Sequence, residues 1–326
     1  MTERRQRVFL NGELSDWKPV LSGVPQGSVL GPLAFVIYIN DLDDMAPDVS
    51  IISKFADDTK LANTAATVEE RTALQDNLNG LCKWADIWGM EYNIAKCKVM
   101  HVGNQNINHD YFMNNSKLEA VDYEKDVGVT VSKDLKPSIH CANAAMAANR
   151  MLGIISRAFH YRDKCVFLRL YKQYVRCHLE YCAPVWSPWS KHDEDMLENV
   201  QKRAIRMISG LQGSYEDKLK ILNLESVAMR RKIIDLVQTF KIMKGFDDVN
   251  YKTWFSCTED NIRNTRLSSY DKNIVTQRAR LDMRKNFFSL RVAHSWNELP
   301  DLVKEAKNPK VFVKMLRAHY GLRDDR

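Results

Sequence analysis

Hydrophobic and polar positions follow two different periodicities along the chain. Up to about residue 136, short apolar runs alternate with turn residues, which predicts strands and hairpins. Beyond that point, apolar residues recur at every third or fourth position over long segments, which predicts helices. We therefore expect two domains, residues 1–136 and residues 137–326.

Two segments of the first domain carry strong local signals. Residues 5–21 predict a hairpin, because an apolar run leads into Asn11-Gly12, a preferred two-residue turn. Residues 67–88 predict an amphipathic helix that ends at Gly89. Its inner face holds Leu74, Leu78, Leu81, Ala85 and Trp88, and its first turn fits a capping box of Thr67 and Glu70.

Two further segments of this domain lie close to candidate chemistry. Residues 28–42 are almost wholly apolar and predict a largely buried helix with Ser28 as its N-cap. Residues 49–63 predict a strand, a two-residue turn at Asp57-Asp58, and a second strand. The predicted fold class is α+β: a small antiparallel sheet with helices, followed by a mostly helical region.

Composition narrows the class of protein. The chain has 326 residues, with 45% hydrophobic and 27% charged residues, as in ordinary globular proteins. No apolar run reaches the ~18 residues of a membrane span, and no signal peptide is evident. Seven cysteines without a CxxC pair indicate reduced thiols. We expect an intracellular protein, nuclear or cytoplasmic, that is neither secreted nor embedded in a membrane.

Charge is distributed unevenly between the two domains. Residues 1–135 contain 13 Lys and Arg against 20 Asp and Glu, whereas residues 136–326 contain 35 against 21. Such an asymmetry indicates nucleic-acid binding by the basic half, although solvated surface charge explains it equally well. Basic clusters at 201–206, 229–232 and 277–285 could follow a phosphate backbone.

Asp57 and Asp58 are the first candidates for chemistry. Aspartate is a common turn residue, so a solvent-exposed turn is one interpretation. The other is a magnesium site, because Mg²⁺ prefers carboxylate oxygens and would neutralise the repulsion between two adjacent acids. Both interpretations stay open for the dipeptide by itself.

The loop at residues 22–32 strengthens the magnesium interpretation. Gly23 and Gly27 allow the backbone to approach a flat ligand closely, Pro25 stiffens the loop, and Gln26 offers both a donor and an acceptor. A simple helix-entry turn is the alternative for the loop considered separately. Its position about thirty residues before Asp57 favours a nucleotide site.

Together these motifs resemble those of reverse transcriptases. The stretches SGVPQGSVLGPLAFVIYINDL and FADDTKL are similar to the nucleotide-contacting motif and the Asp-Asp catalytic motif, most closely those of jockey-like non-LTR retrotransposons. WGMEYNIAKCKVMHVG and EKDVGVTVSKDL are similar to the next palm motif and to the hairpin that grips the primer. QYVRCHLEYCAPVWSP and the C-terminal segment are similar to the extension of these element proteins.

The resemblance implies a partial polymerase palm followed by a helical thumb and extension. It implies that Asp57 and Asp58 bind Mg²⁺, that Pro25, Gln26 and Gly27 contact the incoming nucleotide, and that Lys96 acts on the leaving pyrophosphate. The implied partners are an RNA template, a DNA primer and deoxynucleoside triphosphates.

A third carboxylate is expected in this family from an earlier strand. Before the loop the only acids are Glu3, Glu13 and Asp16, and none has the expected surroundings. We therefore expect a segment that lacks the first catalytic-Asp motif and the fingers, and that is inactive by itself. Two hypotheses follow: a polymerase segment that acts with a preceding part of the element protein, or an inactive nucleic-acid-binding remnant of a truncated element.

Cysteine, histidine and aromatic residues of the second domain have two interpretations each. His178 and Cys182 fall on one helix face, but the spacings do not match a zinc motif, so we expect structural cysteines. The aromatic residues of this domain fit core packing, and stacking on bases is the alternative. They are Tyr171, Tyr174, Tyr181, Trp186 and Trp189.

Overall fold

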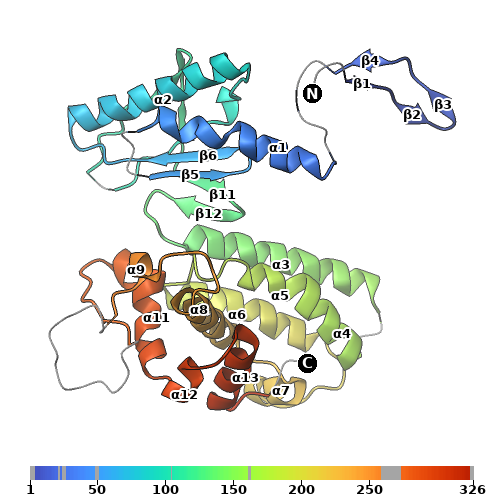
Figure 1. The fold of residues 1–326 in the computed structure, drawn as a ribbon. Helices are drawn as coiled ribbons and strands as arrows, with labels where there is room; N and C mark the ends of the chain where they lie inside the picture. Colours follow the sequence, from blue (N-terminus) through green and yellow to red (C-terminus); the bar gives the residue numbers. More distant parts are fainter. Residues whose placement is uncertain are drawn as a thin grey trace. The chain divides into compact units, whose positions relative to one another are not determined.

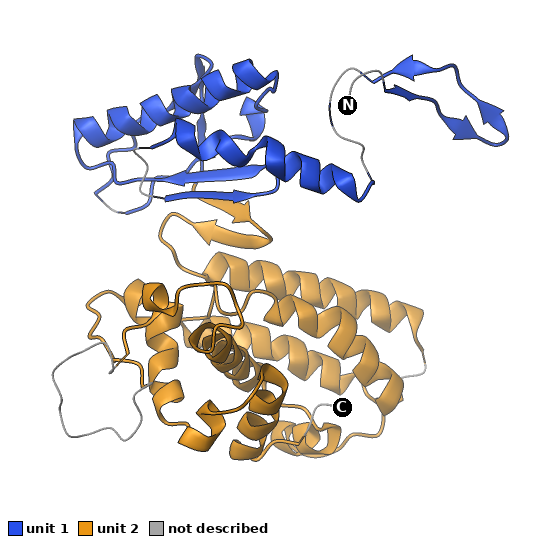
Figure 2. Ribbon diagram, in the orientation of Figure 1, with its two compact units in different colours: residues 1–121 blue, residues 122–326 orange. Residues whose placement is uncertain are grey.

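The chain folds into two compact units, residues 1–121 and 122–326 (Figure 2). The structure is a computed structural model that describes residues 4–20, 23, 27–47, 51–103, 105–160, 163–257 and 273–323. The first unit mixes helices with small sheets, and the second is mostly helical, which confirms the predicted α+β class (Figure 1). The boundary predicted near residue 136 falls inside the second unit, where a hairpin gives way to helices, and the domain assignment stays a prediction.

The hairpin predicted for residues 5–21 forms, and it consists of four short strands in two antiparallel pairs. They are β1 (Arg5–Gln6), β2 (Phe9–Leu10), β3 (Glu13–Leu14) and β4 (Lys18–Pro19). Strand β2 pairs with β3, and β1 pairs with β4, all antiparallel. Asn11 and Gly12 both have positive φ, 51° and 91°, as a type I′ turn requires. The local turn chemistry therefore fixes this register.

The helix predicted at residues 28–42 forms, but it is shorter and more exposed than expected. Helix α1 (Leu30–Tyr38) is followed by the 3₁₀ helix η1 (Asn40–Met45). Ser28 Oγ accepts a hydrogen bond from Gly31 N at 2.9 Å, so the predicted capping contact exists. The prediction of a largely buried helix is wrong, because Gly31 is its one buried residue and Ile37 is 68% exposed. An apolar helix is buried only where another element packs against it.

Helix α2 (Val68–Trp88) confirms the predicted amphipathic helix and both of its ends, but Trp88, which was predicted on the inner face, is 46% exposed. Thr67 and Glu70 form the reciprocal capping box, and Gly89 ends the helix in the left-handed conformation at φ 65°. Leu78, Leu81 and Ala85 are buried. The other elements of this unit are β5 (Ile51–Phe55), β6 (Asp58–Ala62), η2 (Ile94–Lys96), β7 (Lys98–Val99), β8 (Phe112–Met113), β9 (Ser116–Lys117) and β10 (Glu119–Ala120).

The second unit begins with a hairpin and continues as packed helices. The hairpin is β11 (Tyr123–Asp126) with β12 (Val129–Ser132). The helices are α3 (Ser138–Ala158), α4 (Lys164–Leu170), the π-helical η3 (Tyr171–Val175), α5 (Arg176–Glu180), α6 (Lys191–Arg206), α7 (Tyr215–Leu222), α8 (Val227–Met243), α9 (Tyr251–Trp254), α10 (Asp282–Lys285), α11 (Phe288–Asn297), α12 (Asp301–Lys304) and α13 (Pro309–His319).

Two hydrophobic clusters form the core of this unit. One lies among α3, η3, α5 and α6, and it includes Leu152, Tyr171 and Leu197. The other lies among α8, α11 and α13, and it includes Phe240 and Phe312. Helix α8 contacts α6 as well as α11 and α13, so it joins the two halves of the core (Figure 1).

Tyr171 and Trp186 are core residues, as the packing interpretation expected. That interpretation is wrong for Tyr174 and Tyr181, which are exposed. Tyr171 donates a hydrogen bond to Gln201 Oε1 at 2.6 Å. Tyr181 is half exposed, and its hydroxyl donates to the carbonyl of Val127 at 2.9 Å. The tip of the β11–β12 hairpin is therefore attached to the helices of its own unit.

His140, a titratable residue, forms a second contact between the β11–β12 hairpin and the helices. It is buried in α3, its Nδ1 accepts from Thr130 N of β12 at 3.0 Å, and its ring lies 4.4 Å from that of Trp186. Burial, with the nearby charges of Arg231 and Lys125, lowers the pKa of His140 below its usual 6.5.

We predict a loss of stability at mildly acid pH that depends on His140. In the unfolded chain the His140 imidazole is protonated as the pH falls below ~6.5, whereas in the folded chain it stays neutral until its lowered pKa is reached. The free energy of unfolding therefore decreases as the pH falls from ~6.5 toward the folded-state pKa. The measurement is urea unfolding at several pH values, for the wild type and for His140→Gln. A pH slope that is unchanged in His140→Gln would contradict this assignment.

Candidate active site: the β5–β6 hairpin

Asp57 and Asp58 lie at the end of an antiparallel hairpin but in different positions. Strand β5 pairs with β6 so that Phe55 lies opposite Asp58 and Ser53 opposite Lys60. The two-residue turn is thus Ala56-Asp57, and Asp58 is the first residue of β6. The prediction of a turn made by both aspartates is wrong by one residue.

Ala56 takes the special conformation that this turn requires. Its φ is +53°, in the left-handed region that costs a residue with a Cβ about 1–2 kcal/mol. Sequence signals for turns favour Asp over Ala, which explains why the prediction placed the turn one residue too late. Backbone strain of this kind is often found at functional sites.

The two faces of the hairpin have different surroundings. Ile52 and Leu61 point to the inner face and pack with Trp84 and Ala85 of α2 in a hydrophobic cluster. Phe55, Asp58 and Lys60 alternate with them and are exposed. Among the described residues, the carboxylates of Asp57 and Asp58 make no hydrogen bond or ion pair. Both acids are therefore open to a ligand from solvent.

Lys96 is the last residue of η2 and is exposed. Its neighbours Ile94 and Cys97 pack in the same hydrophobic cluster as Leu61 of β6. A shared core thus supports both the Lys96 segment and the strand that carries Asp58. Contact between the Lys96 ammonium and the two carboxylates is not among the interactions of the described residues.

The nucleotide loop is described only in part. Gly27 has a φ of +77° and Gly23 a φ of +80°, and a Cβ at either would meet no atom within 4 Å. Glycine is therefore favoured at both positions by the positive φ of the backbone and not by lack of space for a side chain. Pro25 and Gln26 lie outside the described residues.

Comparison with known proteins connects this hairpin to a family. Residues 3–155 match the family model for reverse transcriptase (RNA-dependent DNA polymerase). Those residues include the loop, the Asp57-Asp58 hairpin and Lys96. This segment belongs to the reverse transcriptase family.

The curated relatives of this reverse transcriptase segment come from non-LTR retrotransposons. The chain is 27% identical over 224 residues to the RNA-directed DNA polymerase from mobile element jockey of Drosophila melanogaster. The aligned region covers 64% of this chain and 24% of that protein. The identity of the chain to the jockey polymerase of Drosophila funebris is 27% over 220 residues, with the same shares. To the probable RNA-directed DNA polymerase from transposon X-element of Drosophila melanogaster it is 24% over 217 residues, again with the same shares.

The chain thus spans about a quarter of the length of the curated relatives it matches. No solved structure matches it at a comparable level of significance. None of the helices in the described ranges is long and apolar enough to cross a membrane.

The reverse transcriptase hairpin offers part of a metal site. Across the part of the chain that the structure describes, no three His, Cys, Asp or Glu side chains gather closely enough to hold a metal ion. Asp57 and Asp58 are two oxygen donors of the type that Mg²⁺ prefers, and they are adjacent and unpaired. By themselves they are too few for a metal site, and they fit a divalent cation only together with further oxygen ligands from outside this hairpin.

Contacts around the inner face hold the hairpin in place, and sequence reasoning missed them. Lys54 Nζ lies 3.0 Å from Asp43 Oδ1 and donates to the carbonyls of Ile39 at 3.0 Å and Asn40 at 3.2 Å. Trp84 Nε1 donates to Asp41 Oδ1 at 3.0 Å. Asp41 and Asp43, in the 3₁₀ helix η1, are therefore bonded to Trp84 of α2 and to Lys54 of β5. A lysine at an inward position of an otherwise apolar strand was the available signal.

We predict that Ala56→Gly stabilises the hairpin by about 0.5–1 kcal/mol, because relief of the left-handed strain outweighs the added entropy of the unfolded chain. The matched control is Ala62→Gly at the other end of β6, where φ is not positive and a loss of ~0.5–1 kcal/mol is expected. Amide hydrogen exchange of Lys60, at the hydrogen-bonded position opposite Ser53, measures both effects locally. Faster exchange in Ala56→Gly than in the wild type would rule out the left-handed turn.

Proposed function

We propose that this chain is part of the RNA-directed DNA polymerase of a non-LTR retrotransposon, and that Asp57 and Asp58 bind its catalytic Mg²⁺. The observation that carries the proposal is the hairpin itself. Within a reverse transcriptase segment, it presents two adjacent, exposed and unpaired carboxylates at a turn with backbone strain. The proposed substrates are an RNA template, a DNA primer and deoxynucleoside triphosphates.

Each residue of the motif has a role in this proposal. Asp57 and Asp58 would hold the metal ions, which neutralise charge on the transferred phosphoryl group and activate the primer hydroxyl. Lys96, on its supported segment, would protonate or neutralise the leaving pyrophosphate. The loop with Pro25, Gln26 and Gly27 would support the incoming nucleotide. The primer would lie against the β11–β12 hairpin. Such a polymerase works inside the cell, in the nucleus or the cytoplasm.

Two carboxylates from one hairpin are too few for a two-metal centre. Octahedral Mg²⁺ requires several oxygen ligands from different directions. We therefore propose that the third carboxylate comes from another part of the element protein, and that the 326-residue chain does not polymerise by itself. The alternative function, an inactive nucleic-acid-binding remnant, shares that expectation.

Metal binding by the hairpin is the direct test of the site assignment. We expect Mn²⁺, used as a paramagnetic probe for Mg²⁺, to broaden the amide signals of residues 56–59 in the wild-type chain at millimolar concentration. Asp57→Asn with Asp58→Asn should abolish this broadening. Asp44→Asn removes another exposed carboxylate of the same unit and should leave it intact. Equal broadening in all three proteins would refute the assignment.

Polymerase activity is tested separately with a primed RNA template, deoxynucleoside triphosphates and Mg²⁺. The expected result for the 326-residue chain is no incorporation above background. Incorporation that disappears in Asp57→Asn would contradict the expected inactivity and would support the catalytic role of the hairpin.

A further inference from the structure

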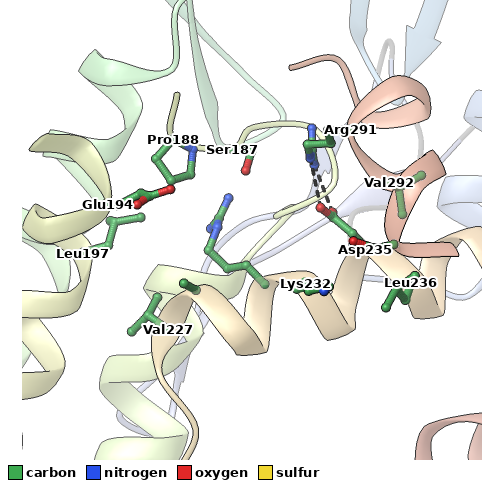
Figure 3. A pocket seen from close by; sticks show the side chains of 13 residues that line it. Ser187, Pro188, Glu194, Leu197, Val227, Lys232, Asp235, Leu236, Arg291 and Val292 are labelled. Carbon is green, nitrogen blue, oxygen red and sulfur yellow. Dashed lines mark hydrogen bonds and ion pairs between the residues drawn. The ribbon is translucent and has the colours of Figure 1, made fainter. Parts of the chain in front are cut away.

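A cavity of about 170 Å³ lies inside the helical unit, far in sequence from the reverse transcriptase motifs (Figure 3). Its walls are the N-terminal half of α8, part of α11, the start of α6 and the segment at Ser187-Pro188. This volume exceeds by about tenfold what one water molecule needs. The cavity is therefore large enough for a polyatomic ligand group.

One ion pair in the wall is fully satisfied. Arg291 of α11 makes a two-pronged contact with Asp235 of α8, with both N–O distances at 2.9 Å (Figure 3). The same guanidinium donates to the carbonyl of Pro184 at 2.9 Å. Asp235 and Arg291 therefore neutralise each other and leave no charge for a ligand.

Arg231 is a second arginine of the wall, and its environment is different. It is only 5% exposed, and it donates to the carbonyls of Leu179, at 2.7 Å, and Trp186. Its guanidinium lies 3.8 Å from the ring centroid of Trp186. Its bonded partners are neutral carbonyls, and its Nε–H has no hydrogen-bond partner. A buried charge with an unsatisfied donor is costly unless a ligand compensates it.

Arg231 stays charged under physiological conditions. Burial is the main reason that its pKa falls to about 10, and the nearby Asp235 opposes part of that effect. At neutral pH the cavity wall therefore carries a buried guanidinium whose charge no directly bonded carboxylate balances.

Two hydroxyl groups complete the set of donors. Ser187 and Ser295 both line the cavity, and neither hydroxyl makes a hydrogen bond within the described ranges. Glu194 lies at the cavity as well, but it is exposed and pairs with Lys191 at 3.5 Å. Lys232 directs its ammonium over the ring of Tyr320, at 4.9 Å. Ser187 and Ser295 thus provide two unused hydroxyl donors around a space whose wall also holds the buried guanidinium of Arg231.

We propose that this cavity binds a phosphate group of a polynucleotide backbone, held by Arg231 and by the hydroxyls of Ser187 and Ser295. A buried cation with hydroxyl donors matches an oxyanion that carries several acceptor oxygens. A polynucleotide is favoured over free phosphate by the charge of the surrounding half, where residues 136–326 hold 35 basic against 21 acidic side chains. The proposal uses no residue of the metal site, so it can fail independently of the polymerase proposal.

Charge reversal inside the cavity tests the site. Ser187→Asp places a carboxylate among the donors, and Ser209→Asp makes the same change at an exposed position of this unit outside the cavity. Binding of a labelled single-stranded RNA of about 20 nucleotides is followed by fluorescence anisotropy, with EDTA, from about 50 to about 200 mM KCl. We expect Ser187→Asp to weaken binding about tenfold and to reduce the salt slope by about one, and Ser209→Asp to change binding about twofold or less.

Circular dichroism confirms that each variant is folded, and Ser295→Asp on α11 replaces Ser187→Asp if the latter does not fold. Equal weakening by the cavity variant and Ser209→Asp would overturn the proposal, as would a wild-type chain that does not bind RNA. Calorimetric titration with inorganic phosphate distinguishes a site for a polynucleotide phosphate from a site for free phosphate. Phosphate binding that is lost in the cavity variant, with RNA binding unchanged, would mean a site for free phosphate and would contradict the polynucleotide assignment.

Discussion

Packing of Ile52 and Leu61 against α2 is the constraint on which the candidate active site depends. Because side chains alternate across a strand, burial of these two residues on the inner face fixes which residues of the hairpin face outward. Leu61 also belongs to the cluster that contains Ile94 and Cys97. The exposed acid at Asp58 and the exposed Lys96 are therefore both supported by the same partly buried residue, Leu61.

In the helical unit, buried arginines hold an irregular backbone segment in place. Arg231 donates to the carbonyl of Leu179 in the last turn of α5 and to that of Trp186, and Arg291 donates to that of Pro184. Pro184 and Trp186 belong to the irregular segment between α5 and α6. Irregular backbone inside a protein must satisfy its polar groups, and arginine provides several donors in a fixed geometry. The segment is held in one conformation by these contacts, and the cavity beside Arg231 results from the same arrangement.

Local signals in the sequence predicted the elements that local chemistry determines. The capping box of Thr67 and Glu70, the stop at Gly89 and the Asn11-Gly12 turn all form as expected. The prediction failed where tertiary contacts decide. The apolar residues of α1 remain largely exposed, because burial requires a packing partner that periodicity does not reveal. The one-residue error at the Asp57 turn has the same origin, since Ala56 adopts a conformation that its own chemistry disfavours.

The positions of Asp57 and Asp58 depend on the register of the β5–β6 hairpin, which nuclear Overhauser effects between Hα atoms measure most directly. Close Hα pairs occur at the non-hydrogen-bonded positions of an antiparallel ladder. We expect such contacts between Lys54 and Thr59 and between Ile52 and Leu61, with Asp57 in the turn and Asp58 in the strand. A contact between Phe55 and Lys60 in their place would put both aspartates in the turn and would contradict this register.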